Sequence, residues 1–290
     1  PLRQLADRFN TLQMGMVSSE RVFKILDTKD RIEDKGELEL SEVKGEIEFR
    51  NVTFGYKEGE PIIKDLSFKA EPGKMLAIVG ATGAGKSTLI NLLGRFYEIW
   101  SGEILLDGVD IRKVKLNSLR EHLAVVLQDV FLFSDSIRNN ITLNKDISHE
   151  EVTEAAEFIG VSDFIETLPD QYDYDVQERG NMLSVGQRQL LSFLRAYVSN
   201  PSVLILDEAT SSIDTQSENL IQKAIEKITK GRTSVVIAHR LATIKAADKI
   251  LVMDKGRVVE EGKHQDLLDK GGYYARLYQM QFKSEEDSPA

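Results

Sequence analysis

The sequence predicts an α/β fold with a mainly parallel sheet at its core, and two observations lead to this class. Short apolar runs alternate with helical segments along most of the chain, a pattern typical of parallel sheets covered by helices. One such run, MLAIV at 75–79, leads through a glycine-rich turn directly into the helical stretch 86–97. We expect two additions to this core, an N-terminal antiparallel β subdomain and a helical subdomain at about 129–200.

The individual elements follow from periodicity and turn chemistry. Residues 46–56 alternate as strands do, and EPGK at 71–74 has the composition of a turn. EILLDG and LAVVLQ predict further strands, and residues 148–151 match a capping box. The elements expected after them are strands at 203–208 and 233–239, a helix from about 214, a hairpin at 249–262 and a last helix at about 264–282.

Three further parts lie outside the main domain, which we place at 44–282. Residues 1–26 carry an apolar stripe at three- and four-residue steps, which predicts a helix. The pattern alone fits equally well a helix that packs on its own domain. Residues 27–43 are rich in charge and predict a solvated linker, and 283–290 predict a disordered acidic tail. The stripe consists of Leu2, Leu5, Phe9, Leu12, Met16, Phe23 and Leu26.

Composition excludes several classes of protein. The formal net charge of −10 lacks the basic footprint of non-specific nucleic-acid binding, so we expect no nucleic-acid partner. The chain has no cysteine, which excludes a disulfide framework and fits a reducing compartment. No apolar run is long enough to cross a bilayer, so we expect this piece to be soluble. Because it starts at Pro1 without a methionine, we expect it to be part of a longer chain.

The segment GATGAGKS at 80–87 matches the phosphate-loop pattern G-x-x-x-x-G-K-[ST]. Its glycines permit backbone dihedrals that turn successive N–H groups toward phosphate oxygens, and the helix dipole adds positive charge. Lys86 is expected to reach the β- and γ-phosphates, Ser87 to ligate Mg²⁺ and Thr88 to bond a phosphate oxygen. A chance glycine-rich turn is the alternative, but the strand before the loop and the helix after it favour a P-loop NTPase. The residues expected to bind nucleotide here are Gly80, Ala81, Thr82, Gly83, Ala84, Gly85, Lys86, Ser87 and Thr88.

A second element supplies the carboxylate that phosphoryl transfer needs. VLILDE at 203–208 predicts a buried strand that ends at Asp207, and ligands bind at the carboxyl ends of strands in such sheets. Asp207 is therefore the expected metal ligand, and Glu208 is expected to orient or deprotonate the attacking water. An apolar run that ends in Asp-Glu is often only a strand end, so this assignment depends on the glycine-rich loop.

The segment LSVGQRQLLSFLRA at 183–196, upstream of VLILDEATSSID, resembles the signature region of ATP-binding cassette (ABC) ATPases, whose motif is LSGGQ. Each further landmark would be an ordinary strand-end or surface residue by itself, but together they follow the family's order. Tyr56 resembles the aromatic that stacks on adenine, and Gln128 resembles the Q-loop glutamine. VQERG at 176–180 resembles the loop before the signature. Asp214 resembles the D-loop, and His239 resembles the switch histidine.

The resemblance implies ATP and Mg²⁺ as cofactors and a head-to-tail dimer with a second ABC ATPase domain, with two ATP molecules held between the domains. Glu208 would act as the base, and Asp214 would run along the interface. The residues implied as catalytic are Lys86, Gln128, Glu208 and His239. The implied metal ligands are Ser87, Gln128 and Asp207. The residues that would face the γ-phosphate of ATP in the other subunit are Ser184, Gly186 and Gln187.

Two stretches, 129–141 and 176–180, resemble exporters in particular, namely the multidrug-type half-transporters of bacteria. Residues 2–26 resemble the end of the last transmembrane helix of those proteins and the linker that follows it. The resemblance therefore implies transmembrane domains as partners, a location at the cytoplasmic face of the cell membrane, and export powered by ATP-driven dimerisation. We expect residues 1 to about 25 to be poorly packed, because their natural neighbours are missing.

Two positions depart from the family's pattern. Gln177 stands where glycine is usual in the loop before the signature, and Val185 replaces the first glycine of LSGGQ. Val185 either points away from the phosphate and changes nothing, or its stiff β-branched side chain weakens the partner's ATP site. The second alternative resembles heterodimeric exporters, which have one competent and one weakened site.

Three other functions fit a chain with a phosphate loop. A soluble ABC-type ATPase that is not coupled to a transporter would be expected to show long coiled-coil insertions, paired cassettes or a basic face, and the sequence shows none of them. A P-loop kinase or GTPase would not need residues 183–187 or His239. A non-catalytic regulatory cassette would not need Glu208 and His239.

Overall fold

The computed structural model describes residues 1–28, 32–208 and 215–281. It divides the chain into two compact units, Pro1–Glu33 and Asp34–Ala290. Each unit has its own fold and is described by itself.

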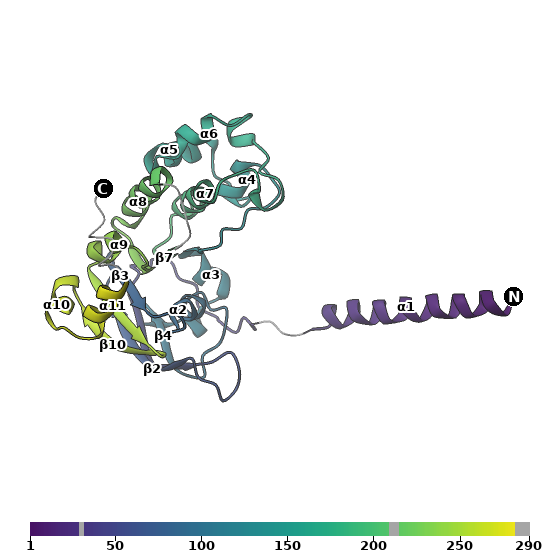
Figure 1. The fold of residues 1–290 in the computed structure, drawn as a ribbon, viewed down its shortest axis with the longest axis horizontal. Coiled ribbons are helices and arrows are strands. Elements are labelled where there is room, and N and C mark those ends of the chain that lie inside the picture. The colour runs from purple at the N-terminus through teal and green to yellow at the C-terminus, as the bar shows by residue number, and fades with distance from the viewer. Residues whose placement is uncertain (29–31, 209–214, 282–290) are drawn as a thin grey trace. The chain divides into compact units, whose positions relative to one another are not determined.

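The first unit contains one helix, α1 (Leu2–Leu26), as the apolar stripe predicts (Figure 1). None of its residues is buried, and Phe9 and Leu26 are 67% and 70% exposed. Within this unit the apolar stripe of the helix therefore has no packing partner, in line with the expected poor packing of residues 1 to about 25. In the described part of the chain, no helix is both long and apolar enough to cross a membrane.

The second unit contains a four-stranded antiparallel sheet in the order β2-β1-β4-β5. Phe49 of β1 stacks on Phe68 of β2, with ring centroids 4.6 Å apart, so the inward side chains pack across the strand pair. The predicted N-terminal antiparallel β subdomain is confirmed. Its strands are β1 (Ile47–Phe54), β2 (Ile63–Ala70), β4 (Ser101–Leu106) and β5 (Val109–Asp110).

A six-stranded sheet lies at the centre of the second unit, in the order β10-β9-β3-β8-β7-β6. All neighbouring strands are parallel except β10, which is antiparallel to β9. The mainly parallel core of a P-loop NTPase is thus confirmed. The strands are β3 (Met75–Gly80), β6 (Leu123–Val126), β7 (Val203–Asp207), β8 (Thr233–Ile237), β9 (Lys249–Asp254) and β10 (Arg257–Gly262).

Burial on both faces explains why β7 reads as a continuous apolar run. Leu204 and Leu206 belong to the core cluster that also contains residues of the helical subdomain. Val203 and Ile205 belong to the second cluster, which they share with the antiparallel sheet. Because successive side chains point to opposite faces, a strand covered on both sides needs apolar residues at every position.

Helices α4 to α7 fall within the predicted helical subdomain, and Figure 1 shows them gathered with α8 on one side of the main sheet. The capping box predicted at 148–151 is present, with Ser148 and Glu151 bonding each other's main-chain N–H. The helices of the second unit are α2 (Lys86–Leu93), α3 (Leu116–Glu121), α4 (Ile137–Thr142), α5 (His149–Ile159), α6 (Ser162–Glu166), α7 (Val185–Val198), α8 (Thr215–Thr229), α9 (Leu241–Ala246), α10 (His264–Asp269) and α11 (Tyr273–Gln281).

The prediction of a single last helix at 264–282 is wrong in one respect, because the structure divides this segment into α10 and α11. Gly271, with φ +63°, turns the chain between them. The carboxylate of Glu260 then accepts the main-chain N–H groups of Tyr273 and Tyr274, at 2.7 and 2.9 Å, and begins a new helix. The predicted tail 283–290 lies outside the described residues.

From Asp34 onward, the charged stretch that precedes β1 belongs to the second unit and is hydrogen-bonded to the rest of it. The N–H groups of Glu37 and Leu38 both donate to the carbonyl oxygen of Lys113 at 3.0 Å. Further along, the N–H of Lys44 donates to the carboxylate of Asp107 at 2.6 Å. The charge count predicted a solvated linker here, but main-chain groups make these contacts, and composition does not reveal them. The domain boundaries themselves stay a prediction.

Candidate nucleotide-binding site

The glycine-rich loop connects the carboxyl end of β3 to the start of α2, as predicted. Gly85 precedes α2 with φ +100°, a conformation that side chains disfavour. A Cβ atom on Gly80 would lie 2.3 Å from the carbonyl oxygen of Met253, so the neighbouring strand β9 leaves no room for a side chain there. The loop geometry therefore depends on glycine at both positions.

Lys86 is folded into this loop and is only 8% exposed. Its Nζ donates to the carbonyl oxygens of Gly80 and Ala81, at 2.8 and 3.2 Å. Burial lowers the pKa of Lys86, and the nearby charge of Asp207 works against this shift. A cation held at the mouth of a loop of main-chain N–H groups provides the charge that a polyphosphate needs.

Ser87 and Asp207 meet where α2 begins and β7 ends. The hydroxyl of Ser87 donates to Oδ2 of Asp207 at 3.4 Å. Burial raises the pKa of Asp207, while the hydrogen bond from Ser87 and the charge of Lys86 lower it. These two hard oxygen donors, beside a cationic loop for the phosphates, fit Mg²⁺, which is usually bound through one or two protein ligands together with substrate phosphates.

Gln128, the third expected metal ligand, follows β6 at the same edge of the sheet. Val126 of β6 pairs with Leu206 of β7, so the two strands end side by side. The side chain of Gln128 is exposed. In the described residues there is no group of three or more acidic, histidine or cysteine side chains that could hold a metal.

Glu208 and His239 follow the neighbouring strands β7 and β8. Glu208 is 3% exposed, and burial raises its pKa, whereas hydrogen bonds from Thr243 and from the main chain of His239 and Arg240 lower it. Burial also lowers the pKa of His239, and the charge of Lys86 lowers it further. An imidazole whose pKa is lowered partly by Lys86 and a buried carboxylate therefore lie at the edge that carries the phosphate loop.

Tyr56 lies beside the start of α2 and contacts Thr88. Its hydroxyl donates to Oγ1 of Thr88 at 3.4 Å and accepts a hydrogen bond from Asn91 at 3.0 Å. The rings of Phe54 and Tyr97 pack against Tyr56 in edge-to-face contacts, with ring centroids 5.1 and 4.9 Å from that of Tyr56. Tyr56 remains 45% exposed. A ring fixed in this way and open to solvent suits base stacking.

The sequence reasoning missed Asn91, Tyr97 and Thr243. Asn91 lies three residues beyond Thr88 on α2, and helical spacing could have placed it on the same face. Tyr97 and Thr243 gave no comparable signal, because both depend on contacts with residues far along the chain.

The signature segment begins α7 through a capping box. The Ser184 hydroxyl accepts the N–H of Gln187 at 3.2 Å, and Oε1 of Gln187 accepts the N–H of Ser184 at 2.9 Å. Gly186 is buried, whereas Val185 is 44% exposed and so does not pack into its own domain. The segment thus presents a capped helix start to the outside. Asp214, the predicted D-loop residue, lies outside the described residues.

Gln177, one of the two departures from the family pattern, has φ +58° and ψ −167°. Residues other than glycine rarely adopt this combination, which costs about 1–3 kcal/mol. The backbone therefore supplies a physical reason why glycine is usual there.

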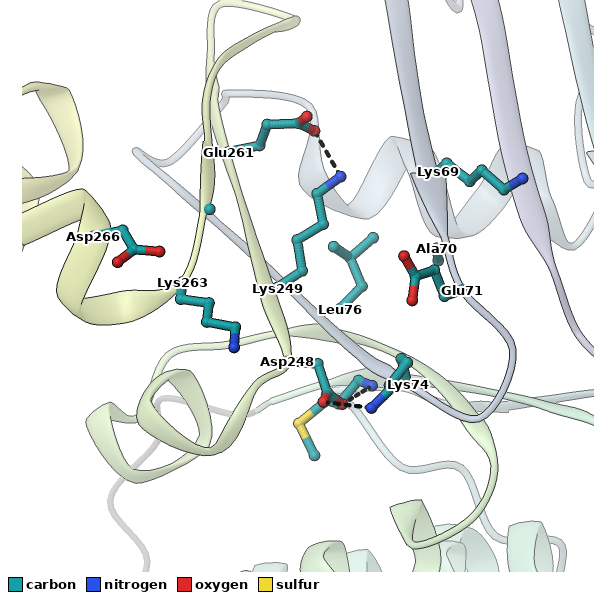
Figure 2. Close-up of a pocket in the computed structure, with 12 residues that line it drawn as sticks. Lys69, Ala70, Glu71, Lys74, Leu76, Asp248, Lys249, Glu261, Lys263 and Asp266 are labelled. Atoms are coloured by element: carbon teal, nitrogen blue, oxygen red, sulfur yellow. Dashed lines mark hydrogen bonds and ion pairs between the residues drawn. The ribbon is translucent and has the colours of Figure 1, made fainter.

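A separate cavity of about 430 Å³ lies at the opposite, amino-terminal end of β3 and β9 (Figure 2). Figure 2 shows two ion pairs among its charged side chains: Lys249 lies 2.8 Å from Glu261, and Lys74 lies 3.2 Å from Asp248. Lysines and carboxylates are equally numerous in its lining. With no excess of either charge, nothing in this cavity favours a nucleotide.

Comparison with known proteins agrees with this geometry. The family model described as ABC transporter matches residues 63–211. An uncharacterised ABC transporter ATP-binding protein of Bacillus subtilis is 46% identical over 98% of this chain and 47% of its own length. An ATP-dependent lipid A-core flippase of Pseudomonas aeruginosa is 46% identical over 100% of this chain and 48% of its own length.

Among solved structures, a bacterial Atm1-family ABC exporter with ATP bound matches with a TM-score of 0.84 and 42% identity. The match covers 94% of this chain and 48% of that exporter chain. This chain spans about half the length of the curated relatives it matches. The chain belongs to the ABC transporter family, of which it carries the ATP-binding domain.

Proposed function

We propose that this chain binds and hydrolyses ATP and that it thereby powers substrate export by an ABC transporter. The observation that carries the proposal is the convergence of Lys86, Asp207 and Glu208, all nine-tenths or more buried, at one edge of a parallel sheet. Buried charges are costly to keep, and such groups are typical of catalytic sites. The flippase and the exporter named above, which are 46% and 42% identical to this chain over the matched part of their length, support a role in export.

In this proposal Tyr56 stacks on the adenine, and the main-chain N–H groups of residues 80–88 surround the phosphates together with Lys86. Ser87, Asp207 and Gln128 hold Mg²⁺, which neutralises phosphate charge and helps align the nucleotide when bound. Positioning and charge neutralisation then lower the barrier to phosphoryl transfer.

Glu208 takes the proton of the attacking water, and His239 holds the γ-phosphate and the water in line. The raised pKa of the Glu208 carboxyl, caused by burial, makes it a better proton acceptor than an exposed glutamate. Burial and the charge of Lys86 lower the pKa of His239, which favours the neutral ring and its use as a hydrogen-bonding group.

Completion of the site requires a second ABC ATPase domain placed head to tail. Ser184, Gly186 and Gln187 then face the γ-phosphate of the partner's ATP, where the capped start of α7 supplies main-chain N–H groups. Asp214 belongs to the same interface in this proposal. ATP holds the two domains together, and hydrolysis releases them, because the contacts differ between the two states.

Transmembrane domains are the second proposed partner, and they place the chain at the cytoplasmic face of the cell membrane. The loop after Gln128 exposes Phe131 and Phe133, which pack edge to face at 5.1 Å and are 54% and 55% exposed. An exposed aromatic pair next to a residue of the nucleotide site suits a docking point for the membrane domain. α1 would continue the last membrane helix.

Replacing Glu208 with Gln tests the enzymatic part of the proposal. Glu208→Gln keeps the shape of the side chain but removes the base, so ATP turnover should fall by about 100-fold or more. ATP binding should persist, and the variant should accumulate as an ATP-bound dimer. Phosphate release, ATP affinity and mass in solution are the three measurements. A Glu208→Gln variant as active as the parent would remove Glu208 from its role.

The identity of the partner domain is a finer proposal that rests on Val185. We propose that the natural partner is a different subunit, whose own residue corresponding to Glu208 is degenerate, so that the site completed by Val185 is the weaker one. In the complete transporter, Val185→Gly should then raise turnover at that site and reduce the asymmetry between the sites. Unchanged turnover and asymmetry would rule the idea out.

A further inference from the structure

Both oxygens of the Glu208 carboxylate are held by one short segment of chain. Oε2 accepts the main-chain N–H groups of His239 and Arg240, at 2.9 and 3.2 Å. Oε1 accepts the hydroxyl hydrogen of Thr243 at 2.5 Å. Because Glu208 is almost completely buried, these contacts determine the direction in which its carboxylate points.

Thr243 is oriented toward Glu208 and away from solvent. It is 1% exposed in the first turn of α9, next to Ile244, which is completely buried. A helical threonine commonly donates to the carbonyl four residues earlier, whereas this hydroxyl bonds a carboxylate 35 residues away. The long-range partner indicates that Thr243 serves the carboxylate and not the helix.

The donors to Glu208 are neutral. The guanidinium of Arg240 lies with its Nη1 3.7 Å from Glu218 of α8, and although its charge also lowers the pKa of Glu208, the Arg240 group that donates to Glu208 is its main-chain N–H. A carboxylate offers about four acceptor positions, of which these bonds use three. Among the residues that the structure describes, no fourth donor occupies the last position, which can accept the hydrogen of a water molecule in a direction fixed by the other three.

We propose that Thr243 is a positioning residue for Glu208 and that it links the orientation of this base to the 239–243 segment, which also carries His239. The inference rests on the proposed role of Glu208 in ATP hydrolysis. The hydroxyl stops the carboxylate from rotating about its terminal bond, and any movement of the His239 loop moves the base with it. Thr243 acts in this proposal through Glu208, the partner of its hydroxyl.

Two substitutions at Thr243 separate the hydroxyl from the volume of the side chain. Thr243→Val has nearly the same shape and lacks the donor, and Thr243→Ser keeps the donor. In the 290-residue chain, Thr243→Val should lower kcat about tenfold and leave KM and the equilibrium affinity for ATP within about twofold of the parent. Thr243→Ser should restore kcat to within about twofold of the parent.

Hydrogen exchange of the His239 and Arg240 amides gives a readout independent of turnover. Exchange at both amides should be faster by about tenfold in Thr243→Val and unchanged in Thr243→Ser, because a loosened carboxylate protects them less. If Thr243→Val fails to fold, as judged by its melting temperature, Thr243→Ala is the second donor-free variant and should give the same result.

The inference is wrong if the Val or Ala variant keeps the parent's kcat, if it raises kcat, or if the Ser variant loses as much as the Val variant. The Glu208→Gln variant, measured alongside, keeps this result separate from the proposed function. If Glu208→Gln is inactive and Thr243→Val is unchanged, only the positioning role falls. If Glu208→Gln is fully active, the role of Glu208 falls with it.

Discussion

The two ends of the central sheet carry charged residues in opposite ways. At the carboxyl end, Lys86 and Glu208 are 8% and 3% exposed, and their pKa values are shifted mainly by burial. At the amino end, Lys74 and Asp248 form an ion pair whose side chains are 54% and 44% exposed. Each end has a hollow or a loop next to it, but only the first places its charges out of water.

This difference separates a site from a surface. Exposed ion pairs contribute about 0–1 kcal/mol, because water and salt screen them. Buried charges interact strongly with whatever enters the site, and they cost stability when nothing compensates them. The cavity in Figure 2 is therefore a poor candidate for chemistry despite its volume, whereas the phosphate loop is a strong candidate.

The sharpest way to break the comparison is to remove one lysine from each end. Lys86→Ala should lower ATP turnover by about 100- to 1,000-fold, because it removes a buried cation aimed at the phosphates. Lys74→Ala, the matched control at the other end, should leave turnover within about twofold of the parent. Phosphate release measures both. Equal effects of the two substitutions would contradict the assignment of the site.

A smaller effect should come from the backbone of the phosphate loop. Gly80→Ala places a methyl group against the carbonyl of Met253 and should destabilise the fold by about 1–3 kcal/mol, measured by urea unfolding. Gly15→Ala is the control, because apart from the neighbouring backbone of α1 itself nothing lies within 4 Å of the added methyl. It should be neutral or slightly stabilising, since alanine favours helix. A Gly80→Ala variant as stable as the parent would disprove the close contact with β9.

In the loop before the signature, relief of backbone strain should raise the free energy of unfolding, whereas Gly80→Ala lowers it. Gln177→Gly should stabilise the chain by about 1 kcal/mol, because glycine adopts the observed dihedrals without strain but gains freedom in the unfolded state. Glu178→Gly, at the next residue, only increases the freedom of the unfolded chain and should therefore destabilise the fold. Melting temperatures measure both changes, and a destabilised Gln177→Gly variant would mean that the backbone is not strained.

The smallest effect is expected at the cavity in Figure 2. Lys249→Ala breaks the exposed pair with Glu261 and should change the free energy of unfolding by less than about 0.5 kcal/mol. ATP turnover should not change. A loss of turnover in this variant would show that residues at the amino end of the sheet affect the nucleotide site. The distinction between a functional carboxyl end and a merely charged amino end would then be wrong.

Much of the site was predictable, because its residues follow rules of spacing. The phosphate loop needs glycines and a lysine at fixed positions, and a buried strand that ends in Asp207 must present its carboxylate at the carboxyl edge. The capping box at Ser184 and Gln187 was also visible, since it links residues three apart. Local geometry fixes such features, and the sequence contains all of it.

The contacts that the sequence did not predict join distant segments. The main-chain bonds of Leu38 to Lys113 and of Lys44 to Asp107 left no trace in composition. The break between α10 and α11 depends on Glu260, which lies in the preceding strand. The bond from Thr243 to Glu208 spans β8 and could not be inferred from either residue alone.

By itself, the sequence determined the α/β class, the family and the chemistry of the phosphate loop, because periodicity and motif spacing are local properties of a chain. Only the tertiary structure decided which charges are buried, where the Glu208 carboxylate points and which hydroxyl donates to it. Strand order brings β7 and β8 together, and with them Glu208 and Thr243. Burial and orientation arise from neighbours distant in sequence, and a one-dimensional pattern does not encode them residue by residue.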